Sequence, residues 1–213
     1  MAMTFAEAMA VLTGPDAPFE IVETEALGRT TKVFKATPPS LRMLFEGLRA
    51  KPADEVFIVY EDERWTFADV LRSIDGIAHV LHTEYGVRKG DRVAIDMRNY
   101  PEWVTSYAAI QSLGAIAVLV NAWWTGPEIE FGLVDTGSTV LVTDRERYDR
   151  IADRLAPLGV RALVVRSEGP LVDGAHHLAD VLDPAGTVPD VDIHPDDDAT
   201  ILFTSGTTGT PKG

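Results

Sequence analysis

The sequence predicts an α/β fold, a doubly wound, mainly parallel sheet with helices on both faces. Between residues 91 and 165, short β-type runs alternate with longer segments that have a helical spacing of apolar residues, as expected for parallel strands joined by helical crossovers. The run AIAVLV at 115–120 is apolar throughout, which is typical of a strand covered on both faces. Gly114 and Gly137 follow two of the helical segments, where glycine commonly ends a helix.

Residues 1–36 are predicted to form an N-terminal arm that precedes the α/β part of the chain at 37–213. Within the arm, β-type segments at 19–25 and 31–36 flank the turn Leu27-Gly28-Arg29. This arrangement around a glycine favours a β-hairpin.

The first part of the α/β region is predicted to contain a helix at 41–48, a strand at 56–60 and a longer helix that stops at Gly86. Thr66 and Asp69 have the spacing of a capping box, which places the start of the longer helix. The apolar residues of this helix recur every three or four positions, so one of its faces is expected to be buried. These residues are Phe67, Val70, Leu71, Ile74, Ala78 and Leu81.

The alternating region has expected strands at 91–97, 115–120, 139–143 and 161–165, and expected helices at 99–114, 125–137 and 145–158. The next segment, 167–199, is rich in Asp, Pro and Gly. It is expected to be a connector with one helical turn near 178–182. Residues 200–203 are predicted to form a last strand, which leads into the segment TSGTTGTPKG at 204–213.

Composition argues against several classes of protein. The chain has 213 residues and a net charge of −14, which disfavours nucleic acid as a partner because nucleic acid needs a basic surface. The absence of Cys excludes disulfides and Cys-ligated metals. The N-terminus lacks the basic region of a signal peptide, and the longest apolar stretch, 108–120, is interrupted by polar residues and glycine. We therefore expect a cytoplasmic protein without a transmembrane segment.

The TSGTTGTPKG segment has the composition of a phosphate-binding loop. Glycines let backbone N–H groups approach phosphate oxygens closely, the hydroxyl side chains add donors, and Lys212 adds a positive charge. The segment is not a Walker A loop, because Pro211 precedes Lys212 and Gly213 follows it. The predicted nucleotide-binding residues are Thr204, Ser205, Gly206, Thr207, Thr208, Gly209 and Lys212.

The same segment resembles the signature of the adenylate-forming (AMP-binding) superfamily, Thr-Ser-Gly-Ser/Thr-Thr-Gly-x-Pro-Lys-Gly, at every fixed position. The stretch from RWTFADVL at 64–71 to AIAVLVN at 115–121 is similar to the N-terminal region of that superfamily. The arm and the sequence PPSLRML at 38–44 resemble the acyl-CoA synthetase and fatty-acid–CoA ligase branch, with less specificity.

The resemblance implies a two-step ligase reaction. A carboxylate, with a fatty acid as the preferred substrate, attacks the α-phosphate of ATP to give an acyl-adenylate and pyrophosphate. Coenzyme A then displaces AMP through its thiol. In the superfamily the loop that matches residues 204–212 holds the β- and γ-phosphates, and Mg²⁺ helps to neutralise the departing pyrophosphate.

The resemblance also implies that the adenine pocket, the Mg²⁺-binding Glu and the catalytic Lys of the superfamily lie beyond Gly213. Residues 37–213 are then the N-terminal part of an adenylation domain, truncated at the phosphate-binding loop. We assign no catalytic or metal-ligating residue to this chain and expect the fragment to be inactive by itself. Uncovered sheet edges favour a homo-oligomer, and peripheral membrane contact is left open.

Two alternative functions are kept. One is a non-catalytic nucleotide- or partner-binding module that uses the same loop. The other is a dimeric aspartic protease, based on the sequence LVDTGST at 133–139, which would need two facing Asp carboxylates. Against the protease, Asp135 is predicted to lie in the last turn of a helix, with Gly137 directly after that helix.

Trp123 and Trp124 follow a predicted buried strand at its carboxyl end. Ligands bind at that edge of an open α/β sheet, so the pair could line an acyl or subunit surface. Packing beneath the next helix is the favoured interpretation for both side chains.

Overall fold

The structure is a computed structural model that describes residues 3–204 and residue 213. The chain divides into two compact units. Unit 1 contains Met1–Ser40 and His194–Asp196, and unit 2 contains Leu41–Ile193 and Asp197–Gly213. In the described parts of both units, no helix is long and apolar enough to cross a membrane.

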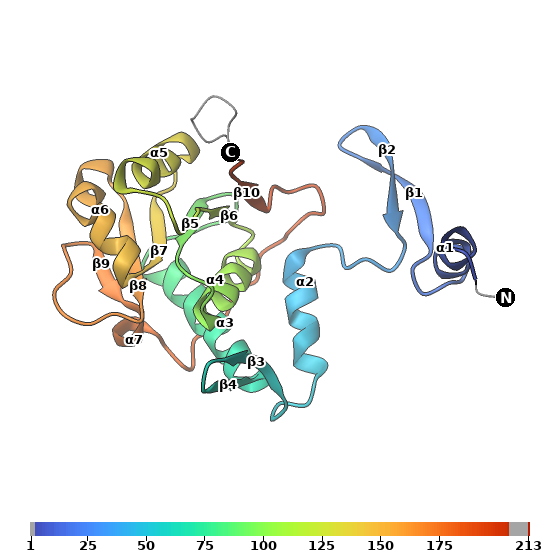
Figure 1. The fold of residues 1–213 in the computed structure, drawn as a ribbon, viewed down its shortest axis with the longest axis horizontal. Coiled ribbons are helices and arrows are strands. Elements are labelled where there is room, and N and C mark those ends of the chain that lie inside the picture. Colours follow the sequence, from blue (N-terminus) through green and yellow to red (C-terminus); the bar gives the residue numbers. More distant parts are fainter. Residues whose placement is uncertain (1–2, 205–212) are drawn as a thin grey trace. The chain divides into compact units, whose positions relative to one another are not determined.

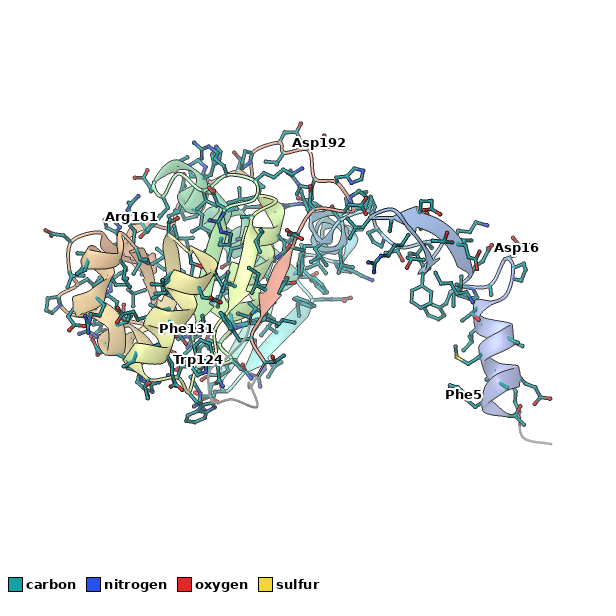
Figure 2. The ribbon with its side chains drawn as sticks, turned by 90° about the horizontal axis from the view of Figure 1, so that it is seen from above. Phe5, Asp16, Trp124, Phe131, Arg161 and Asp192 are labelled. Atoms are coloured by element: carbon teal, nitrogen blue, oxygen red, sulfur yellow. The ribbon has the colours of Figure 1, made fainter. Side chains whose placement is uncertain are left out.

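Unit 1 contains a helix and the predicted hairpin. Strands β1 (Ile21–Ala26) and β2 (Arg29–Phe34) pair antiparallel, with positive φ angles at Leu27 and Gly28 in the turn between them. Helix α1 (Phe5–Thr13) was not predicted, although Thr4 and Glu7 form a capping box at its start. No residue of α1 is buried, and Phe5 projects from the helix into solvent (Figure 2). Helices are usually recognised in a sequence by a stripe of apolar residues that becomes buried, and α1 has no buried face of this kind.

Unit 2 begins with α2 (Leu41–Glu46), a 3₁₀ turn (Gly47–Ala50) and the hairpin of β3 (Val56–Tyr60) with β4 (Glu63–Thr66). Strand β3 was predicted at these residues, whereas β4 was not predicted. Strand β4 is only four residues long and is followed directly by α3 (Phe67–Thr83). The predicted capping box of α3 is present in both directions.

The central sheet of unit 2 has six strands in the order β10-β6-β5-β7-β8-β9, and every neighbouring pair is parallel. The predicted doubly wound architecture is thereby confirmed (Figure 1). The strands are β5 (Arg92–Asp96), β6 (Ile116–Leu119), β7 (Val140–Asp144), β8 (Arg161–Val165), β9 (Ala175–His177) and β10 (Thr200–Leu202). The helices between them are α4 (Pro101–Ser112), α5 (Gly126–Thr136), α6 (Arg145–Leu158) and α7 (Leu178–Val181).

Two hydrophobic clusters lie on opposite faces of this sheet. One contains the buried side chains of α3 and α4, and the other contains those of α5 and α6. Along β5, Val93 and Ile95 belong to the first cluster, whereas Ala94 belongs to the second. Strand residues therefore meet apolar neighbours on both faces, which explains the continuous apolar runs in the sequence.

The segment 167–199 is more ordered than the predicted connector. It contains β9, which extends the sheet by pairing with β8, as well as the predicted helical turn, α7. His176 in β9 lies within hydrogen-bond distance of Tyr85, with 3.0 Å between Nδ1 and the phenol oxygen. A strand of three residues with two histidines has no periodicity that sequence reasoning could detect.

Candidate functional site

The loops at the carboxyl end of the sheet form the candidate site. Helix α4, which follows β5, packs on one face of the sheet, and helix α5, which follows β6, packs on the other. Strand β5 connects to β6 on one side, whereas β7, on the other side of β5, connects onward to β8. The connections therefore diverge between β5 and β7, and open α/β sheets bind ligands at such a switch point. Strand β10 pairs with β6, so the start of the TSGTTGTPKG segment lies at this edge.

Several non-local contacts hold β10 in place. The Tyr107 hydroxyl lies 3.0 Å from Thr200 Oγ1, and Gln111 donates from Nε2 to the Ala199 carbonyl at 2.7 Å. The rings of Trp124 and Phe203 pack edge to face, with 5.0 Å between their centroids. The strand that precedes the TSGTTGTPKG segment is thus fixed by α4 on one side and by the loop after β6 on the other.

Of the predicted nucleotide-binding residues, Thr204 is the one that the structure describes, and it is exposed at the end of β10. The other six lie outside the described residues: Ser205, Gly206, Thr207, Thr208, Gly209 and Lys212. Their phosphate-binding role stays a prediction. The position of Thr204 agrees with it, because the segment starts at the ligand-binding edge of the sheet.

The two tryptophans after β6 have different environments. Trp124 is 8% exposed and packs against Phe203 and beneath α5 near Gly132, as the favoured interpretation predicted. Trp123 is 70% exposed, and the guanidinium carbon of Arg98 lies 4.2 Å from its ring centroid. The prediction of packing was therefore wrong for Trp123, because the loop directs the two adjacent side chains to opposite sides.

Arg98 and Trp123 line a pocket of about 270 Å³ together with Tyr60, Asn99 and Ala122. Three separate segments build it, namely the β3–β4 hairpin and the loops after β5 and β6. Sequence reasoning missed Arg98 and Tyr60. Neither residue belongs to a sequence motif. They become candidates only because the fold brings them into one pocket with Trp123.

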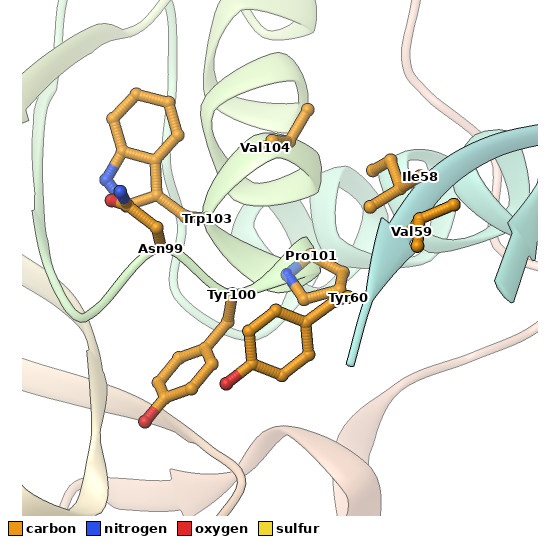
Figure 3. Close-up of a pocket in the computed structure, with 8 residues that line it drawn as sticks. All are labelled: Ile58, Val59, Tyr60, Asn99, Tyr100, Pro101, Trp103 and Val104. Carbon is orange, nitrogen blue, oxygen red and sulfur yellow. The ribbon is translucent and has the colours of Figure 1, made fainter. Parts of the chain in front are cut away.

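A second pocket, of about 300 Å³, shares Tyr60 and Asn99 with the first. Asn99 is its one amide side chain, and the other lining residues are aliphatic, aromatic or proline. Tyr60 and Tyr100 lie next to each other, with hydroxyls directed away from Ile58 (Figure 3). The pocket is therefore suited to an apolar group. Its lining residues are Ile58, Val59, Tyr60, Asn99, Tyr100, Pro101, Trp103 and Val104.

Arg166, directly after β8, holds Tyr60 and Tyr100 in place. Its guanidinium carbon lies 5.1 Å and 4.9 Å from their ring centroids. The same guanidinium donates to both Glu63 oxygens at 2.7 and 2.9 Å and to Glu102 at 2.8 Å. The hydrogen bonds that Glu63 accepts from Arg166, and then the one from Trp65, lower the pKa of Glu63. Arg166 also has a φ of 48°, a strained value for a non-glycine residue, so the surrounding contacts must hold it there.

Replacing Arg166 with Lys should lower the free energy of unfolding by about 1–2 kcal/mol, because an ammonium group cannot reproduce the bidentate contact or the stacking. Urea titration would measure the change. Arg64→Lys is the matched control, because within the described part of the chain Arg64 donates to the nearby carbonyls of Glu61 and Glu63 and to no carboxylate. Equal effects of the two substitutions would contradict the role given to Arg166.

A buried ion pair lies beneath the loops. Arg147 and Asp144 are 1% and 3% exposed, with 3.2 Å between Arg147 Nη1 and Asp144 Oδ2. Asp144 Oδ2 also accepts from the Arg98 backbone N–H at 3.0 Å. Arg147 Nε donates to the Ala122 carbonyl at 2.9 Å. One ion pair thus holds both the loop after β5 and the loop after β6.

Asp96, the last residue of β5, is buried beside this pair. Neither of its carboxylate oxygens has a hydrogen-bond partner among the residues that the structure describes. Burial, and then repulsion from Asp144, raise the pKa of Asp96 to about 7, while the charges of Arg147 and Arg150 act in the opposite direction. Near neutral pH, part of the population therefore carries a neutral carboxylic acid at the end of β5.

Comparison with known proteins decides the family. The sequence profile described as AMP-binding enzyme matches residues 44–213. The chain belongs to the AMP-binding enzyme family. This confirms the resemblance that the TSGTTGTPKG segment indicated. In this family member, the strand that leads into that segment pairs with β6, the neighbour of β5 on the side away from the switch point.

Its relatives include acid–CoA ligases. The chain is 29% identical over 185 residues to the crotonobetaine/carnitine–CoA ligase of Salmonella agona, covering 82% of this chain and 35% of the ligase. It is 30% identical to the anthranilate CoA ligase AuaEII in complex with anthranoyl-AMP, with a TM-score of 0.75, over 83% of this chain and 35% of that one. A Mycobacterium tuberculosis fatty acyl CoA synthetase is 29% identical, with a TM-score of 0.65, over 82% and 34%. The chain thus spans about a third of the length of these relatives.

Within residues 3–204, no group of three or more His, Asp or Glu side chains is placed to hold a metal ion. Asp135 lies in the last turn of α5, as predicted, and is exposed, with Gly137 after it in the left-handed conformation. The LVDTGST sequence is therefore a helix end, which is not the structural context that an aspartic protease needs.

Proposed function

We propose that this chain is the N-terminal part of an ATP-dependent acyl-CoA synthetase and that the TSGTTGTPKG segment binds the β- and γ-phosphates of ATP. The proposed enzyme converts a carboxylic acid to an acyl-adenylate and pyrophosphate and then transfers the acyl group to coenzyme A. The observation that supports this most directly is the pairing of β10 with β6, because it starts the segment at the carboxyl edge of a parallel sheet.

The residues proposed to bind phosphate fit a polyanion. Thr204, Ser205, Thr207 and Thr208 offer hydroxyl donors, Gly206 and Gly209 allow close backbone approach, and Lys212 offers a positive charge. Bound Mg²⁺ would neutralise further negative charge on the phosphates. What this chain would contribute is binding and orientation of the phosphates, which favours departure of pyrophosphate.

A fatty acid is the proposed substrate, supported by the likeness to a fatty acyl CoA synthetase and by the sequence of residues 38–44. The likeness to an anthranilate CoA ligase supports an aryl acid instead. Competition between octanoate and anthranilate in the assay described next would decide between the two acids.

In the protein that carries this chain, Lys212→Ala should reduce ATP–pyrophosphate exchange about 10–100-fold, because one charge-assisted contact to the phosphates is lost. Lys89→Ala is the control, since Lys89 forms an ion pair with Asp197 and donates a hydrogen bond to the Asp192 carbonyl. It should leave exchange within about twofold. Residues 1–213 alone should give no exchange above background.

Two outcomes would overturn the proposal. Exchange that is insensitive to Lys212→Ala would remove the phosphate-binding role of the segment. ATP binding without any exchange in the protein that carries this chain would favour the alternative, a non-catalytic nucleotide-binding module.

We also propose that the free edge of β10 pairs with further protein, either from a second copy or from the remainder of the same protein. Among the described strands, β10 has β6 as its neighbour on one side, and Leu202 is 65% exposed. Exposed apolar edge strands are usually covered in native assemblies.

A further inference from the structure

We propose that Arg98 and Trp123 form a second ligand site, which binds the anionic head of a small amphipathic molecule while the neighbouring apolar pocket holds its tail. The head is a carboxylate or a phosphate, and the tail is aliphatic or aromatic. The proposal rests on the proposed function in one respect, since an acid–CoA ligase handles molecules of this class. The site uses none of the predicted phosphate-binding residues at 204–212.

The guanidinium of Arg98 is available to a ligand. Among the described residues 41–193, Arg154 forms an ion pair with Glu130 at 3.8 Å, and every other arginine apart from Arg98 donates to a carboxylate or a carbonyl. Arg98 contacts the Trp123 ring, with 4.2 Å between the guanidinium carbon and the ring centroid. Stacking uses one face of the guanidinium and leaves its in-plane N–H donors free for the two oxygens of an anion.

The charge of Arg98 is not neutralised within its pocket. The other residues that line the pocket are Tyr60, Asn99, Ala122 and Trp123, none of which is acidic. Arg166 is a useful contrast, since Glu63 and Glu102 satisfy its guanidinium. In a chain with a net charge of −14, a cation in a concave site with no acidic partner among the described residues attracts anions locally.

The backbone that carries this pair is held from below. Asp144 accepts from the Arg98 N–H at 3.0 Å. The Ala122 carbonyl accepts from Arg147 at 2.9 Å and from Arg150 at 3.2 Å, and Arg150 also donates to the Trp124 carbonyl at 2.7 Å. A binding group held by buried partners loses little conformational entropy when a ligand arrives.

The neighbouring apolar pocket indicates that the ligand also has an apolar tail. It adjoins the Arg98 pocket through the shared residues Tyr60 and Asn99, and the remainder of its lining includes Ile58, Trp103 and Val104 (Figure 3). An anionic head on Arg98 therefore leaves a chain or ring free to enter the apolar pocket. Neither a free inorganic anion nor a neutral alcohol would use both parts.

Calorimetric titration of the chain with three eight-carbon probes tests the site. Octanoate and octyl phosphate share a tail with octanol but differ in the head. Arg98→Gln should weaken binding of at least one anionic probe about 10-fold, as expected for loss of a charge-assisted hydrogen bond. It should change octanol binding less than about twofold. Arg154→Gln is the control, because it removes the same charge from an exposed side chain that lines neither pocket.

The larger loss on Arg98→Gln, for octanoate or for octyl phosphate, identifies the head as carboxylate or phosphate. Equal losses for all three probes, or equal effects of Arg98→Gln and Arg154→Gln, would overturn the site. The outcome is independent of ATP–pyrophosphate exchange. Exchange with no Arg98-dependent binding would reject the site alone, and Arg98-dependent binding with no exchange would reject the proposed enzyme alone.

Discussion

Replacing Arg147 with Met is expected to lower the free energy of unfolding by about 3–5 kcal/mol, because it leaves the buried carboxylate of Asp144 without its ionic partner. Met keeps much of the volume of the side chain, so the loss reports charge more than packing. Arg147 also donates to the Ala122 carbonyl, which would lose a donor. Urea-induced unfolding monitored by circular dichroism would measure the change.

Two further variants make this prediction specific. Arg154→Met removes an arginine from the same helix, but that side chain is 57% exposed and lies 3.8 Å from Glu130, so the expected loss is below about 1 kcal/mol. Adding Asp144→Asn to Arg147→Met should restore stability in part, because Asn remains a good N-cap and has no charge. A double variant less stable than Arg147→Met would contradict the explanation.

Replacing Asp96 with Asn should change how stability depends on pH. The pKa of Asp96 is raised to about 7 in the folded protein, against about 3.9 for an unfolded Asp. Between these values the folded state holds a proton that the unfolded state has released, so wild-type stability falls as pH rises from about 4 to about 7. Asn does not titrate. Its stability relative to wild type should therefore rise across this window by up to about 4 kcal/mol, from 1.36 kcal/mol per pKa unit.

The test is the change of stability with pH and not the stability at one pH. The Asn amide also introduces unpaired donors, and their cost is the same at every pH. Unfolding free energies at pH 4, 6 and 8 would define the slope. Asp149→Asn is the control, because Asp149 is a 52% exposed partner of Arg145 and should change the slope little. A difference between Asp96→Asn and wild type that stays constant from pH 4 to pH 8 would show that the pKa of Asp96 is not raised in the folded protein.

The predicted secondary structure was most accurate where the signal is local. The capping box of α3, the glycine at the end of α5 and the apolar runs of β5 to β8 lie where the sequence indicated. Elements whose stability depends on partners were missed. Strand β9 exists because β8 offers an unpaired edge, and α1 has no buried face that would produce a periodic pattern.

The residues of the candidate site likewise fall into those that the sequence indicated and those that only the fold brings together. The TSGTTGTPKG segment was recognisable because its chemistry is contiguous in sequence. Arg98, Tyr60 and Arg166 were not, because each belongs to a different segment and acquires meaning only through contact with Trp123 or with another of the three. Asp96 was unremarkable in sequence, and its raised pKa results from burial beside Asp144.

By itself, the sequence determined the family, the alternation of strands and helices and the family signature at 204–213, since each is encoded by neighbouring residues. Only the tertiary structure decided the strand order that places β10 beside β6. It also decided that Trp124 is buried while Trp123 is exposed next to Arg98. The physical reason is that crossover direction and loop packing depend on contacts between distant segments, which local propensity and periodicity do not contain.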